Sequence, residues 1–91
     1  MLIDKVLEKE KLSVKEEAIM DTLEFKASSG EFKLTKRQTE AIVVIKENPG
    51  MRHGGHGHTK GNVSFVRHPA QGVVRAVFEN VDGTKEYFSM Y

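Results

Sequence analysis

The architecture follows most directly from GVVRAVFENVDGTKEYFSMY, residues 72–91. Two runs rich in valine, phenylalanine and tyrosine flank the turn-forming sequence Val-Asp-Gly at positions 81–83, which is typical of an antiparallel β-hairpin. A third candidate strand, residues 62–67, precedes these runs and is joined to them by the turn-forming sequence His-Pro-Ala-Gln. We therefore predict an antiparallel meander of three strands over residues 62–67, 72–80 and 84–91.

Cross-strand charge decides the length of the hairpin loop. A three-residue loop with Gly83 in the left-handed conformation sets Glu79 opposite Lys85. A two-residue Asp-Gly turn would instead set Glu79 opposite Glu86. Because opposite charges stabilise a cross-strand pair and like charges destabilise it, we predict the three-residue loop.

The predicted register assigns alternate side chains to the two faces of the sheet. One face, which we expect to lie in the core, carries Val74, Ala76, Phe78, Phe88 and Met90. The other face carries Val73, Arg75, Val77, Tyr87 and Tyr91. A second face with two valines and two tyrosines is unusually apolar, so either a helix covers it or it contacts a partner.

The first half of the chain predicts two or three helices. A short amphipathic helix is indicated by apolar residues at helical spacing: Leu2, Ile3, Val6 and Leu7. Ser13 and Glu16 have the spacing of a capping box, in which two side chains bind backbone N–H groups that a helix start leaves unpaired. Thr35 and Gln38 have the same spacing, and the helix that they begin should end at the Asn-Pro-Gly sequence of positions 48–50.

Residues 23–34 fit two structures. In the first, the helix that begins after Ser13 continues, with Leu23 and Ala27 on its apolar face, and stops at Gly30. In the second, Ser28 and Ser29 form the turn of a β-hairpin whose opposing pairs are Lys26/Glu31, Phe25/Phe32, Glu24/Lys33 and Leu23/Leu34. Two apolar pairs and two opposite-charge pairs in one register favour a hairpin. The sequence leaves both structures open.

These elements define an α+β fold, with two or three N-terminal helices, an alternative hairpin at 23–34, and a C-terminal three-stranded meander. A chain of 91 residues has room for one small domain, so we expect a single domain over residues 1–91. Glycine and histidine dominate positions 50–61, which we expect to form a flexible loop.

Composition excludes several classes of protein. The sequence is 38% hydrophobic and 30% charged, as expected of a globular protein. It contains no cysteine, which excludes a disulfide scaffold, a thiol nucleophile and cysteine-based metal sites. The longest apolar run, residues 41–45, is too short to cross a bilayer, so we expect a cytoplasmic protein with no membrane partner.

The charge distribution suggests the first functional hypothesis. Net charge is only +1, but no Asp or Glu occurs in residues 48–78. This acid-free segment should have a positive potential that attracts phosphates, unless it is simply a solvated loop. We therefore predict a small, non-enzymatic regulatory protein that contacts nucleic-acid phosphates through Arg52, His53, His56, His58, Lys60, Arg67, His68 and Arg75.

Two further hypotheses remain open. The first is a protein-interaction module or inhibitor, or a homodimer, that uses Val73, Val77, Tyr87 and Tyr91. The second is chemistry by the histidines: a metal-independent ribonuclease, in which His, Tyr, Lys and Arg act as base, acid and cation, or a Zn²⁺ or Ni²⁺ site at His53, His56 and His58. Ordering a glycine-rich loop costs about 1–2 kcal/mol per residue, so we expect no cofactor at these histidines. Because most histidines in loops are not catalytic, we also assign no catalytic residue.

Overall fold

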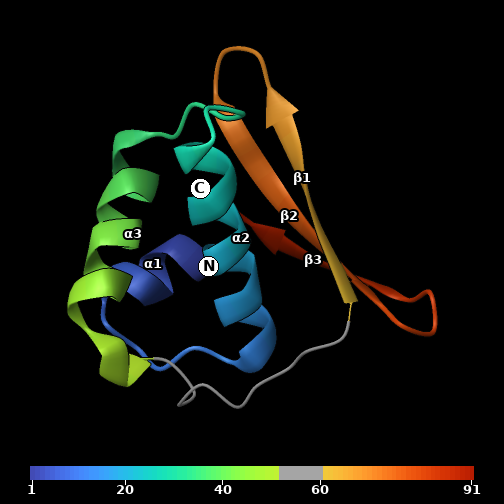
Figure 1. Ribbon diagram of the computed structural model, residues 1–91, viewed down its shortest axis with the longest axis horizontal. Helices are drawn as coiled ribbons and strands as arrows, with labels where there is room; N and C mark the ends of the chain where they lie inside the picture. The colour runs from blue at the N-terminus through green and yellow to red at the C-terminus, as the bar shows by residue number, and fades with distance from the viewer. Residues whose placement is uncertain (52–60) are drawn as a thin grey trace.

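The computed structural model describes residues 1–51 and 61–91 and consists of three helices followed by a three-stranded antiparallel sheet (Figure 1). The helices are α1 (Leu2–Leu7), α2 (Val14–Ser28) and α3 (Lys36–Glu47), and a short 3₁₀ helix, η1 (Pro49–Met51), follows them. The strands are β1 (Gly61–His68), β2 (Gly72–Asn80) and β3 (Lys85–Ser89), in the order β1-β2-β3. The predicted α+β arrangement is confirmed.

Most of the predicted flexible loop at about 50–61 lies outside the described residues; its first residues belong to η1 and its last begins β1. None of the helices in residues 1–51 and 61–91 has the length and apolar character needed to cross a bilayer.

Both predicted capping boxes are present. The Ser13 hydroxyl accepts a hydrogen bond from the Glu16 N–H at 3.2 Å, and the Glu16 carboxylate accepts one from the Ser13 N–H at 2.8 Å. Thr35 and Gln38 make the same reciprocal pair, with both distances 3.1 Å. These bonds satisfy N–H groups that the first turn of a helix cannot pair internally, which is why α2 and α3 begin where they do.

Of the two structures considered for residues 23–34, the helix is correct and the hairpin is wrong. Helix α2 continues to Ser28, and Gly30 takes the left-handed conformation, with φ of +81°. The N–H of Gly30 then bonds the Ala27 carbonyl and the N–H of Glu31 bonds the Lys26 carbonyl, which satisfies the last carbonyls of the helix. The hairpin hypothesis rested partly on a Lys26–Glu31 ion pair, which forms at 3.3 Å across this helix end instead.

The helices lie together on one side of the sheet, and no described helix covers its other side (Figure 1). Helix α1 packs on α3, while α2 contacts β1 and β2. All three helices and the sheet contribute to the core, whose fully buried side chains include Ile3, Val6, Ile19, Leu23, Ala41, Ala76, Phe78 and Met90.

The β2–β3 hairpin has the predicted three-residue loop. Glu79 lies opposite Lys85, and Gly83 is left-handed with φ of +90°. The Asp82 carboxylate accepts hydrogen bonds from the hydroxyl and the backbone N–H of Thr84, at 2.6 and 3.0 Å. These bonds lower the pKa of the Asp82 carboxyl below its ordinary value.

A β-bulge changes the predicted faces at the start of β2. The β1–β2 register pairs Val66 with Arg75 and Arg67 with Val73, so that Val74 is an additional residue on β2. Because the extra residue reverses the alternation, Val73 is fully buried in the core and Val74 is only partly buried. The assignments of Val73 to the partner-binding face and of Val74 to the core are therefore wrong.

Among the residues that the structure describes, Gln38 is the only polar residue that is buried with the core. Its side-chain NH₂ group donates hydrogen bonds to the Val73 carbonyl at 2.8 Å and to the Met90 carbonyl at 2.6 Å. Its side-chain oxygen accepts the hydrogen bond from the Thr35 N–H that completes the capping box. One side chain therefore joins the start of α3 to β2 and to the segment after β3.

We expect Gln38→Leu to lower the free energy of unfolding by about 2–4 kcal/mol, because two buried carbonyls would lose their donor. Urea denaturation monitored by circular dichroism measures this change. The matched control is Gln71→Leu at the other glutamine, which is exposed and should change stability by less than about 0.5 kcal/mol. Equal effects of the two substitutions would contradict a structural role for the Gln38 amide.

A second stability prediction concerns the Glu16 carboxyl, which also forms an ion pair with Lys5 at 2.8 Å. Burial raises the pKa of this carboxyl, but hydrogen bonds from Lys5 and Ser13 lower it further than burial raises it, so the pKa lies below its ordinary value of 4.5. A carboxyl with a lowered pKa stabilises the fold above its unfolded pKa, and this contribution is lost as the pH falls through the folded pKa.

We therefore expect Glu16→Gln to destabilise the protein by about 1 kcal/mol near pH 7 and by less near pH 3, where part of the carboxyl is protonated. Urea denaturation of wild type and variant at both pH values tests this difference. Glu40→Gln, at an exposed position of α3, is the control. An equal destabilisation by Glu16→Gln at both pH values would show that ionisation of Glu16 does not contribute.

Candidate functional site

The structure describes three of the eight residues predicted to contact nucleic acid. Arg67 and His68 lie at the end of β1, and Arg75 lies within β2. The other five lie outside the described residues: Arg52, His53, His56, His58 and Lys60. Of the predicted phosphate contacts, the structure therefore places Arg67, His68 and Arg75.

Arg67 makes internal contacts on the helix-covered side of the sheet. Its Nη1 donates a hydrogen bond to the Glu31 carbonyl at 2.9 Å, and its guanidinium lies 5.0 Å from the centre of the Phe32 ring. The Lys26 ammonium lies 5.8 Å from the same ring, and Phe65 meets it edge-on at 5.4 Å. Arg67 therefore ties the end of β1 to the turn after α2.

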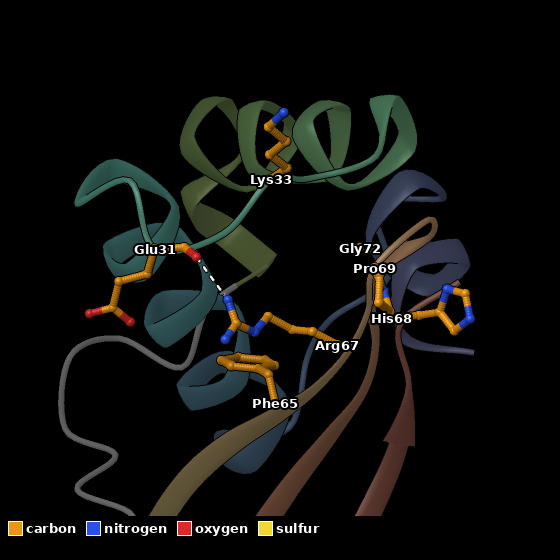
Figure 2. Close-up of a pocket in the computed structure, with 7 residues that line it drawn as sticks. All are labelled: Glu31, Lys33, Phe65, Arg67, His68, Pro69 and Gly72. Carbon is orange, nitrogen blue, oxygen red and sulfur yellow. Dashed lines mark hydrogen bonds between the residues drawn. The ribbon is translucent and has the colours of Figure 1, made fainter.

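A hollow of about 600 Å³ lies beside Arg67, lined by Glu31, Lys33, Phe65, Arg67, His68, Pro69 and Gly72. Figure 2 shows that its basic side chains diverge: Arg67 points toward Glu31, while Lys33 and His68 point in two other directions. The His68 Nδ1 accepts a hydrogen bond from the Ala70 N–H at 3.1 Å. Because these groups do not converge, the hollow lacks the geometry of an anion site.

Arg75 lies on the opposite side of the sheet, which no described helix covers. The register places Ser64, Val77 and Tyr87 in one row across the three strands, and Val66, Arg75 and Ser89 in the next. We call these residues, together with Tyr91, the open face. Its apolar side chains are unusually accessible: Tyr87 is 61%, Tyr91 51% and Val66 47% exposed.

Both tyrosines and Arg75 border one hollow of about 540 Å³, whose other lining residues are Val74, Phe88 and Ser89. The Arg75 guanidinium lies 5.8 Å from the centre of the Tyr87 ring, within the range of a cation–π contact. The Tyr91 hydroxyl donates a hydrogen bond to the side-chain oxygen of Gln71. The open face thus presents two aromatic rings and a guanidinium close together.

Charge on this side of the sheet is weakly positive. Arg75 is exposed and takes part in none of the ion pairs formed among residues 1–51 and 61–91. Lys85 is also exposed and lies opposite Glu79 in the register, so the strand residues on this side carry two positive charges and one negative charge. The Arg75 charge is therefore available to a ligand.

The sequence did not identify Ser64 and Val66 as part of this surface. Their faces depend on the β1–β2 register, and that register depends on the bulge at Val74, for which the local sequence carries no signal. In the part of the chain that the structure describes, no group of three or more His, Asp or Glu side chains could hold a metal ion. The predicted metal ligands His53, His56 and His58 lie outside that part.

The fold and this surface define a small α+β protein with an aromatic, uncovered sheet face. No protein-family model, curated protein or solved structure matches the chain.

The two arginines should differ in their effect on stability. We expect Arg67→Ala to lower the free energy of unfolding by about 1 kcal/mol, because it removes a hydrogen bond and a cation–π contact. Arg75→Ala should lower it by less, because among the described residues it removes the cation–π contact with Tyr87 and no comparable hydrogen bond. Thermal or urea denaturation of the two variants measures both effects, and the reverse order would contradict this assignment of their roles.

Proposed function

We propose that this is a small, non-enzymatic cytoplasmic binding protein, and that its ligand is single-stranded nucleic acid held on the open face. The observation that carries the proposal is the grouping of Tyr87, Tyr91 and the available Arg75 guanidinium around one hollow of an uncovered sheet. Proteins bind single strands without sequence preference by combining aromatic platforms with positive charge.

The tyrosines provide surfaces on which bases can stack. Each stacked base contributes about 1–3 kcal/mol, and every base offers a flat π face. Tyr87 lies within β3 and Tyr91 lies two residues beyond its end, and both rings border the same hollow, so we expect each ring to receive a different base. Bases of a duplex are already stacked on each other, which favours a single strand as the ligand.

Charge supports the same ligand. Arg75 belongs to the acid-free segment of residues 48–78, so that its surroundings in sequence add positive charge and no carboxylate. Its guanidinium can bind a phosphate in a bidentate manner or stack beside a base. We expect Arg52, Lys60 and the neighbouring histidines to add phosphate contacts, whereas Arg67 acts mainly within the fold.

A protein ligand is the second candidate for the open face. Val66 is about half exposed and lies near Val77 in the next row, and aliphatic side chains contribute little to nucleic-acid binding. Tyr and Arg are also the residues most enriched at the centres of protein interfaces. The protein would then act as an interaction module or inhibitor, and its binding would weaken far less with added salt than phosphate binding does.

Intrinsic tyrosine fluorescence tests the nucleic-acid proposal with unusual selectivity. The chain has two tyrosines and no tryptophan, and both tyrosines lie on the open face. Titration with a mixed-sequence single-stranded oligonucleotide at low salt should quench this fluorescence, because bases stack on the rings. Added salt should reverse the quenching, because release of counterions from the phosphates drives part of the binding.

Matched variants locate the contact. Tyr87→Ala should weaken binding about tenfold or more, and Arg75→Ala should weaken it and also reduce its salt dependence. Lys36→Ala removes the same charge from an exposed position in the helical layer and should change affinity by less than about twofold. Binding without quenching, or equal losses for Arg75→Ala and Lys36→Ala, would contradict a site on the open face. A complete lack of binding would favour the protein ligand.

A further inference from the structure

Strand β1 forms one edge of the sheet. Within residues 1–51 and 61–91 it pairs with β2, and no other strand lies beside it. It is eight residues long, so its outer edge carries a row of backbone N–H and C=O groups that the β1–β2 ladder does not use. Such an edge can accept a further strand by main-chain hydrogen bonding.

The sequence of β1 lacks the features that usually protect an edge strand. Residues 61–66 contain no charged residue and no proline, although both commonly prevent edge-to-edge pairing. Apolar side chains also remain accessible on both faces: Val66 is 47% exposed, while Val63 and Phe65 are only partly buried.

The opposite edge is protected in the usual way. Strand β3 is only five residues long and carries Lys85 and Glu86. The Glu86 carboxylate forms an ion pair with Lys15 of α2. The two edges of the same sheet therefore differ, and β1 is the one suited to pairing.

We propose that β1 pairs with β1 of a second copy of the chain, antiparallel, around a two-fold axis that passes through Ser64 perpendicular to the sheet. Such an axis keeps the helices of both copies on the same side, so residues on one face meet residues on the same face. Ser64 then lies opposite Ser64 of the second copy. Val63 lies opposite Phe65 of the second copy on the helix-covered side, and Asn62 lies opposite Val66 on the open side.

Apolar side-chain pairing without repulsion between like charges favours a second copy over a strand of another kind. The register forms two Val63–Phe65 pairs, and pairs of an aromatic with a β-branched residue are among those that stabilise antiparallel strands. Arg67 lies opposite Gly61, so no like charges face each other. The dimer would have one continuous sheet, with the two open faces side by side. Its formation does not depend on which ligand the open face binds.

Charge reversal at the axis tests this arrangement. Analytical ultracentrifugation should show a concentration-dependent dimer of twice the 10.3 kDa chain mass. Ser64→Glu and Ser64→Lys each place two like charges opposite one another, and each should raise the dissociation constant at least tenfold. An equimolar mixture of the two variants should form the heterodimer. Ser64 is exposed, so both variants should fold, which circular dichroism verifies.

A single thiol gives an independent measurement. Because the chain has no cysteine, Ser64→Cys contains one thiol, and oxidation should link two copies through it. Ser28→Cys, at an exposed position at the end of α2, is the control and should remain unlinked under the same conditions. Tyr87→Ala should leave the dimer intact, since it alters the open face rather than the edge.

Any of three results would overturn the proposal. The first is a wild-type chain that stays monomeric up to about 1 mM, the range of the weakest specific association. The second is a dimer that both Ser64 charge variants retain with unchanged affinity, because such a dimer would use another surface. The third is loss of the dimer in Tyr87→Ala, which would assign self-association to the open face.

Discussion

The side-chain amide of Gln38 is the interaction on which the arrangement of helices and strands depends. Hydrophobic burial packs the helices against the sheet, but it is non-directional and does not fix where one element ends against another. The Gln38 amide is directional: it joins the carbonyls of Val73 and Met90 to the first turn of α3. A buried polar group is tolerated only when it is hydrogen-bonded, so a slip of either strand would leave buried carbonyls without a donor.

This constraint also shapes the open face. Val73 is held in the core, and the bulge at Val74 then returns Arg75 to the uncovered side of the sheet. At the other end of the chain, Gln38 holds the Met90 carbonyl, and the Met90 N–H bonds the Val74 carbonyl. Met90 is thereby buried, and Tyr91 remains half exposed beside Tyr87 and Arg75. The fold and the candidate site are thus connected through one amide.

Local signals made much of this structure predictable. The capping boxes located the starts of α2 and α3, and the Glu79–Lys85 pair determined the hairpin loop, because each effect acts within a few residues. The same signals failed where contacts between distant parts of the chain determine the structure. The Lys26–Glu31 attraction suggested a hairpin but is equally compatible with the helix end that Gly30 closes. Simple alternation places Val73 on the wrong face, because the bulge forms where β2 pairs with β1 and because the Gln38 amide bonds the Val73 carbonyl from a distant part of the chain. For the same reason the burial of Gln38 and the place of Val66 on the open face could not be predicted.

We propose that this protein binds its ligand on the open face rather than in the hollow beside Arg67. Amide ¹H–¹⁵N spectra recorded during titration with a single-stranded oligonucleotide test it most directly, because they report on every backbone position at once. We expect the largest shifts within β2, β3 and the C-terminal segment at Arg75, Val77, Tyr87 and Tyr91, and little change at Lys33 and at the end of β1 near His68. Shifts concentrated at Lys33, Arg67 and His68, with the open face unchanged, would contradict it.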